Sequence, residues 1–94
     1  MEKVLIFENN RSKEYWFRRI LKTLSNQNVS LKAYLYKHEI WFNGNRILFK
    51  TEYDINRLFT VGRHNTKYYN DMENKLENNF IETLKEIFDE ETRD

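Results

Sequence analysis

The sequence predicts an α+β fold in which a strand, a helix, a three-stranded antiparallel meander and a long C-terminal helix follow one another. Three observations support this order: an apolar run near the N-terminus, an Asn-Gly pair between two β-rich runs, and apolar residues at helical spacing near the end. Because 94 residues are too few for two independent cores, we expect residues 1–94 to form a single small domain.

The first two elements are predicted to be a buried strand and an amphipathic helix. Residues 4–7 are all apolar, which is typical of a strand covered on both faces. Asn10 or Ser12 can cap the helix that follows, and we expect this helix to end near residues 25–28. Two sets of side chains then fall on its opposite sides. The apolar set is Trp16, Phe17, Ile20, Leu21 and Leu24, and the cationic set is Arg18, Arg19 and Lys22.

The middle of the chain predicts three antiparallel strands. Residues 31–36 alternate between apolar and polar or aromatic side chains, and residues 40–42 and 46–50 are rich in β-formers. Asn43-Gly44 separates the last two runs, and both residue types accept the positive φ that a two-residue hairpin turn needs. This turn places Ile40, Phe42, Ile47 and Phe49 on one face of the sheet, and Trp41, Arg46 and Leu48 on the other.

The last predicted element is a long helix that begins near residues 70–71 and extends to about residue 90. Its apolar residues are Met72, Leu76, Phe80, Leu84, Ile87 and Phe88. A helix of this length extends over roughly 30 Å. Its apolar side either packs on the sheet or pairs with a second copy in a homodimer, and the small size of the chain favours packing on the sheet. For residues 51–59 the sequence fits either a short helix that begins at Asp54 or an irregular chain.

The charges of the chain are divided between its two parts. Residues 1–67 have a net charge of +7 and residues 68–94 a net charge of −6, although the total is only +1. Such a division indicates either an electrostatic binding surface or two parts that face each other within one fold.

The basic part supports the first function hypothesis, a non-enzymatic accessory or regulatory protein that binds nucleic acid. Aromatic side chains on a sheet can stack on bases while neighbouring cations contact phosphates. The candidate residues are Arg18, Arg19, Lys22, Tyr34, Tyr36, Trp41, Arg46 and Arg63. The competing interpretation is that the cations are only solvated side chains on the outside of the helix and sheet, and that the aromatic side chains pack beneath a helix.

The acidic part supports a second hypothesis, a protein–protein interaction module. An acidic helix can occupy a basic groove, for example on a nucleic-acid enzyme of a host that the chain would inhibit. The candidate residues are Glu73, Glu77, Glu86, Asp89 and Glu90, with the Trp41 face of the hairpin as another docking surface.

Catalytic and cofactor chemistry has little support in the sequence. The absence of cysteine excludes disulfides and thiolate metal sites, and neither His38 nor His64 has the spacing of a zinc ligand. Residues 63–69 combine a histidine, cations and phenols, which metal-independent RNA cleavage could use as a third, weaker alternative. We therefore assign no catalytic residue, metal or cofactor. No apolar run approaches the length of a membrane span, so we expect a cytoplasmic protein with no membrane partner.

Part of the chain resembles phage terminase large subunits. The similar stretches are residues 3–7, the helix through residues 19–21, residues 39–49 and Gly62, which together look like the region between the Walker A and Walker B motifs of that family. Both Walker motifs are missing here, so the resemblance carries over no catalytic residue. It implies a phage-type small protein.

Overall fold

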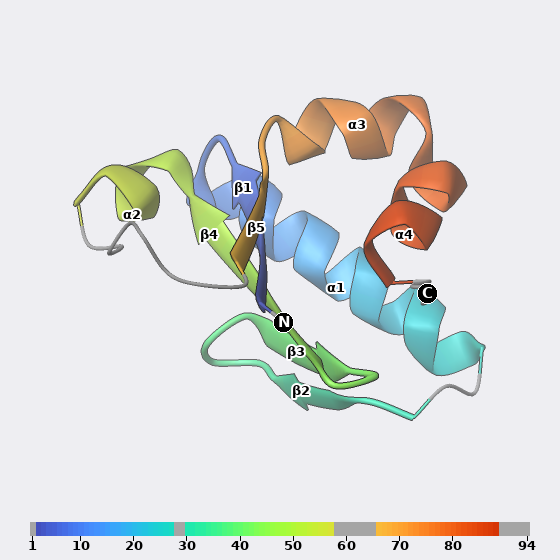
Figure 1. Ribbon diagram of the computed structural model, residues 1–94. Coiled ribbons are helices and arrows are strands. Elements are labelled where there is room, and N and C mark those ends of the chain that lie inside the picture. Colours follow the sequence, from blue (N-terminus) through green and yellow to red (C-terminus); the bar gives the residue numbers. More distant parts are fainter. Residues whose placement is uncertain (1, 28–29, 58–65, 89–94) are drawn as a thin grey trace.

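The computed structural model describes residues 2–27, 30–57 and 66–88, which form a five-stranded sheet and four helices (Figure 1). The strands are β1 (Glu2–Phe7), β2 (Lys32–Tyr34), β3 (Glu39–Phe42), β4 (Asn45–Thr51) and β5 (Thr66–Tyr69). The helices are α1 (Asn10–Asn26), α2 (Glu52–Arg57), α3 (Met72–Asn78) and α4 (Phe80–Phe88). The predicted α+β class is confirmed.

The strands lie in the order β2-β3-β4-β1-β5. The antiparallel meander β2-β3-β4 is confirmed, whereas β1 pairs in parallel with both β4 and β5. Residues 4–7 are all buried, because Leu5 and Phe7 face the core beneath α1, α3 and α4, whereas Val4 and Ile6 pack with Leu48 on the opposite face, next to Ile55 of α2. The expectation that the first strand is covered on both faces is therefore also confirmed.

The hairpin between β3 and β4 has the predicted turn. Asn43 and Gly44 adopt φ values of 52° and 77°, the positive values that a type I′ turn requires. Trp41 lies opposite Arg46, and Phe42 lies opposite Asn45. The predicted division of this hairpin into an apolar face and a Trp41 face follows from this register.

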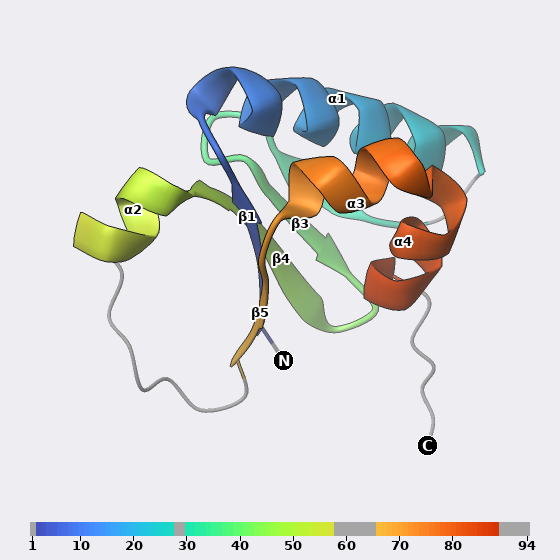
Figure 2. The same cartoon turned by 90° about the horizontal axis from the view of Figure 1, so that it is seen from above.

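Helices α1, α3 and α4 gather on one side of the sheet, as Figure 2 shows from above. The main core lies between this helix layer and the sheet, where Phe49 stacks on Phe7 at 5.8 Å and meets the edge of Phe17 at 5.0 Å. The apolar side of α1 is buried as predicted. Asn9 caps this helix, not Asn10 or Ser12, because its Oδ1 accepts a hydrogen bond from the Ser12 backbone at 2.9 Å.

The prediction of a single C-terminal helix is wrong, because the helix is interrupted at Asn79. This residue has φ −155° and ψ 76°, outside the helical region, so α3 ends at Asn78 and α4 begins at Phe80. Asparagine is a poor helix former, since its side chain competes for backbone hydrogen bonds. The break turns α4 relative to α3 (Figures 1 and 2), and both helices bury apolar residues in the same core. Burial of the apolar stripe within the chain is confirmed.

Two further expectations about strands are corrected. Strand β2 ends at Tyr34, so Leu35 and Tyr36 lie in the turn before β3 and do not continue the alternation. Residues 66–69, expected within a basic loop, form β5 at the edge of the sheet beside β1. Four residues are too short for a periodic signal, and pairing with a buried neighbour makes this strand.

The open question about residues 51–59 is resolved in favour of a helix over Glu52–Arg57, although Asp54 does not begin it, and residues 58–59 lie outside the described residues. The Thr51 hydroxyl accepts a hydrogen bond from the Asp54 backbone at 3.1 Å, and the Asp54 carboxylate accepts one from the Thr51 backbone at 3.2 Å. This reciprocal capping box starts α2 after Thr51. Ile55 of α2 then packs on a small second core of Val4, Ile6 and Leu48. No helix of the described residues is both long and apolar enough to cross a membrane.

Candidate functional site

The sheet face opposite α1, α3 and α4 is called the open face here. Alternate residues of each strand point to it, and the register aligns them in two rows across the five strands. The first row is Lys32, Trp41, Arg46, Glu2 and Thr66. The second row is Tyr34, Glu39, Leu48, Val4 and Tyr68. Among the described elements, α2 packs on this face over the second core.

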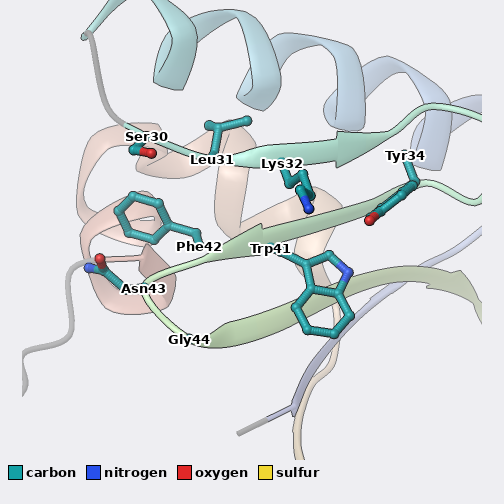
Figure 3. Close-up of a pocket in the computed structure, with 8 residues that line it drawn as sticks. All are labelled: Ser30, Leu31, Lys32, Tyr34, Trp41, Phe42, Asn43 and Gly44. Atoms are coloured by element: carbon teal, nitrogen blue, oxygen red, sulfur yellow. The ribbon is translucent and has the colours of Figure 1, made fainter.

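Three aromatic side chains of the open face are exposed in spite of their size. Trp41 is 43% exposed, Tyr34 40% and Tyr68 37%. Figure 3 shows Lys32, Tyr34 and Trp41 on the same side of the β2-β3 pair, whereas Phe42 points to the other side. A shallow pocket of about 530 Å³ lies along these residues and the hairpin turn. Exposed aromatic rings beside a cation are suited to stacking on a flat ligand.

Trp41 is held in place by a buried carboxylate. Its Nε1 donates a hydrogen bond of 2.6 Å to the carboxylate of Glu39, a residue that is only 4% exposed. Arg46 donates from Nε to the same Glu39 oxygen at 2.9 Å and from Nη1 to Glu2 at 2.7 Å. The Arg46 guanidinium also lies 5.7 Å from the Trp41 ring centre. The indole is therefore fixed although Trp41 stays 43% exposed, which reduces the entropy that a stacked ligand must overcome.

The hydrogen bonds between Glu39 and Arg46 favour the ionised forms of both side chains. Burial by itself raises the pKa of Glu39, but the hydrogen bonds from Arg46 and Trp41 outweigh it, and the pKa of the carboxyl lies below its ordinary value. The hydrogen bond to Glu39 in turn raises the pKa of Arg46. Glu39 and Arg46 both stay ionised at neutral pH, and their charges offset one another. The Lys32 and Lys37 ammonium groups add positive charge nearby, and Lys37 lies 5.8 Å from the Tyr34 ring centre.

The predicted cations of α1 lie on the other side of the molecule. Arg18, Arg19 and Lys22 are exposed on the helix layer, so they cannot contact the same short ligand as Trp41. Arg18 pairs with Glu14 at 2.7 Å on the same helix. Arg19 lies 4.7 Å from the Phe80 ring centre and 5.3 Å from that of Trp16, so it joins α1 to α4 by packing.

The structure therefore brings together only part of the predicted nucleic-acid set. Tyr34, Trp41 and Arg46 share the open face. Tyr36 is 97% exposed in the turn after β2, outside the sheet, and Arg63 lies outside the described residues. The candidate set predicted from the sequence did not include Lys32 or Glu39, which also belong to this face. The alternation of β2 could have identified Lys32, since it lies two positions before Tyr34.

The residues predicted for a protein partner are spread over two helices. Glu73 and Glu77 lie on α3, and Glu86 lies on α4 beyond the break at Asn79. Glu77 and Glu86 are exposed, and Glu73 is half-buried. Asp89 and Glu90 lie outside the described residues. The acidic side chains consequently do not form the single helical face that the sequence predicted.

Within the described ranges, no group of three His, Asp or Glu residues could hold a metal ion. His64, the histidine of the RNA-cleavage alternative, lies outside those ranges, whereas Thr66–Tyr69 of the same segment form β5.

Comparisons with family models, curated proteins and solved structures found no match for this chain. The resemblance to terminase large subunits stays a prediction.

Proposed function

We propose that this protein binds single-stranded nucleic acid, without catalysis, through the open face of its sheet. The observation that carries the proposal is the fixed but exposed Trp41 ring between Lys32 and Arg46 in one row of the sheet. Stacking on an aromatic ring requires unpaired bases whose faces are accessible, as in a single strand. Lys32 and Lys37 supply cations for the phosphates, and Tyr34 offers a second ring beside them.

The proposal differs from the sequence-based hypothesis in leaving out Arg18, Arg19 and Lys22 of α1. A strand of a few nucleotides that lies on Trp41 cannot reach the outer side of the helix layer. Arg19 also has a packing role against Phe80, which accounts for its presence without a ligand.

The first prediction concerns Trp41→Ala, which we expect to weaken the binding of a short single-stranded oligonucleotide about tenfold or more. Base–aromatic stacking contributes about 1–3 kcal/mol per base. Trp41→Phe retains a ring and should keep most of the affinity. Fluorescence anisotropy of labelled DNA and RNA strands at several salt concentrations measures these affinities and their salt dependence.

Two matched controls test whether the open face is responsible. Tyr15→Ala removes a ring that is 54% exposed on α1, and Lys22→Gln removes an exposed cation from the helix layer. Both controls should bind almost like the unchanged protein. Equal binding by Trp41→Ala and the unchanged protein contradicts the proposal, as does a larger loss in the α1 variant.

Tryptophan fluorescence gives an independent check. The chain has two tryptophans, and Trp16 is only 4% exposed, so quenching by a stacked base reports mainly on Trp41. If neither DNA nor RNA binds at low salt, the proposal is wrong and the protein-partner hypothesis gains weight. The form of that alternative that uses the acidic residues has less support, since Glu73 and Glu77 lie on one helix and Glu86 on another.

A further inference from the structure

A second pocket of about 500 Å³ lies where the turn between β2 and β3 meets α1 and β4. Lysines from three elements line it: Lys13 of α1, Lys37 of the turn and Lys50 of β4. Glu39 and Arg46 line it as well, but they pair with each other at 2.9 Å, so their charges offset. The pocket as a whole has an excess of positive charge.

The three lysines have no carboxylate partner in the part of the chain that the structure describes. The ion pairs found there join Arg18 to Glu14, and Arg46 to Glu2 and Glu39. Like charges gathered around one pocket repel each other, and the repulsion is relieved when an anion binds between them. This arrangement is suited to a ligand with more than one negative charge.

His38 lies in the same pocket and is fixed by its neighbours. Its ring meets the edge of the Phe17 ring at 5.0 Å, and its backbone oxygen accepts a hydrogen bond of 3.0 Å from Phe49. Its φ of 56° places it in the left-handed region, as expected of a polar turn residue. The imidazole is therefore held at the pocket as a polar group of defined position.

The charges around His38 are dominated by cations. Burial lowers its pKa most, the positive charge of Lys13 lowers it next, and Arg18 and Lys50 lower it further. Glu14 of α1 raises it, but not enough to reverse the direction. Lys13 and Lys50, which line the pocket, are therefore close enough to act on the imidazole, although burial is the largest cause of its lowered pKa.

We propose that this pocket binds a phosphate group, with Lys13, Lys37 and Lys50 as its cations and His38 as a hydrogen-bond donor. A phosphate offers several acceptor oxygens and up to two negative charges, which match convergent lysines. The inference deepens the proposed function and rests on it in one respect: Arg46 both lies over Trp41 and lines the pocket. A nucleic-acid strand stacked on Trp41 would then place one of its phosphates here.

The test follows the pKa of His38 by NMR in the intact protein, with inorganic phosphate as the probe. A bound anion stabilises the imidazolium, so phosphate should raise the pKa of His38, whereas chloride at equal ionic strength should not. His38→Asn identifies the signal, since the chain has one other histidine, His64. Asparagine also tolerates the positive φ at this position.

Matched lysine variants separate the pocket from general surface charge. Lys13→Gln and Lys50→Gln should each weaken phosphate binding about fivefold, the upper range for one accessible ion pair. Lys22→Gln removes the same charge from the exposed side of α1 and should change the affinity less than twofold. If phosphate leaves the pKa of His38 unchanged, or if all three variants bind phosphate alike, the pocket is not a phosphate site.

Oligonucleotides with a 5′-phosphate, a 3′-phosphate or neither distinguish the source of the phosphate. If one phosphorylated strand binds more tightly than the unphosphorylated strand, and Lys13→Gln abolishes this difference, the pocket binds the terminal phosphate of that strand. An equal rise in the pKa of His38 with all three strands assigns it to a backbone phosphate, and a rise with inorganic phosphate alone assigns it to the free ion. In the last case the pocket stands without its link to a strand, and the proposed function fails only if the strands also do not bind. Trp41→Ala separates the two proposals, because it weakens strand binding and leaves phosphate binding unchanged.

Discussion

Glu39 is the residue on which the geometry of the open face depends most. It accepts hydrogen bonds from both Trp41 and Arg46, and it is nearly inaccessible to solvent. A buried carboxylate is costly unless its acceptors are satisfied. Here Trp41 of the same strand and Arg46 of the neighbouring strand donate to one oxygen, and Arg46 also approaches the other oxygen at 3.4 Å. The same hydrogen bonds fix the orientation of the indole. The stability of the fold and the geometry of the open face are therefore coupled through one side chain.

Glu39→Gln should lower the free energy of unfolding by about 2 kcal/mol at pH 7, because the hydrogen bonds lose their charged acceptor. The pKa of Glu39 is lowered in the fold, so its ionised form stabilises the protein at pH values above 4.5, the ordinary value. This contribution is lost as the pH falls through the lowered pKa. The difference between variant and unchanged protein should then disappear at strongly acidic pH.

Urea unfolding at neutral and acidic pH measures this difference. The control is Glu77→Gln, which removes an exposed carboxylate from α3 and should have little effect at either pH. A Glu39→Gln variant as stable as the unchanged protein at pH 7 contradicts the proposed role of this carboxylate. So does a difference that persists unchanged below the lowered pKa.

At the scale of elements, the β3-β4 hairpin positions the open face. Its two-residue turn sets the register that places Trp41 opposite Arg46, and a shift by one residue would move Trp41 toward the helix layer. The turn itself depends on the positive φ of Asn43 and Gly44. The side-chain arrangement of the site thus follows from the backbone of two residues.

Gly44→Ala should destabilise the fold by about 1 kcal/mol, because alanine is strained at a φ of +77°. A clash does not contribute, since an added Cβ meets nothing within 4 Å. Gly44→Asn is the matched control and should cost less, because asparagine adopts the left-handed region more easily. Thermal unfolding followed by circular dichroism compares the two, and equal Tm values for Ala and Asn would show that backbone strain is not the cause.

The whole molecule is stabilised mainly by the core between the sheet and three helices. This core joins residues that are distant in the chain, from Leu5 of β1 to Phe88 of α4. The buried Lys3 side chain adds a polar link, since its Nζ donates a hydrogen bond to the backbone oxygen of Ile87. The C-terminal helix is therefore part of the fold that supports the sheet, and not an accessory to it.

Ile87→Ala should lower the free energy of unfolding by about 3 kcal/mol, because it leaves a cavity beneath α4 where the isoleucine is fully buried. Ile81→Ala makes the same chemical change on the same helix at a residue that is 52% exposed, and should cost far less. Urea unfolding measures both variants. Similar losses at the two positions would contradict the placement of α4 on the core.

Much of the local structure follows from the sequence alone. The unbroken apolar run predicts the buried β1, the helical spacing predicts the buried side of α1, and Asn43-Gly44 predicts the hairpin with its register. These features depend on short-range periodicity and on the φ preferences of single residues, which are local properties. The pairing of Trp41 with Arg46 on one face was predictable for the same reason.

Tertiary contacts decided the rest. Strand β5 exists because it pairs with β1, and the helix breaks at Asn79 where α3 and α4 bury apolar side chains in one core. The predicted site was divided because α1 covers one face of the sheet while Trp41 lies on the other, a separation that no local pattern encodes. The sequence by itself determined which side chains share a strand or helix face, and packing determined which faces meet, because burial of apolar area depends on the whole chain.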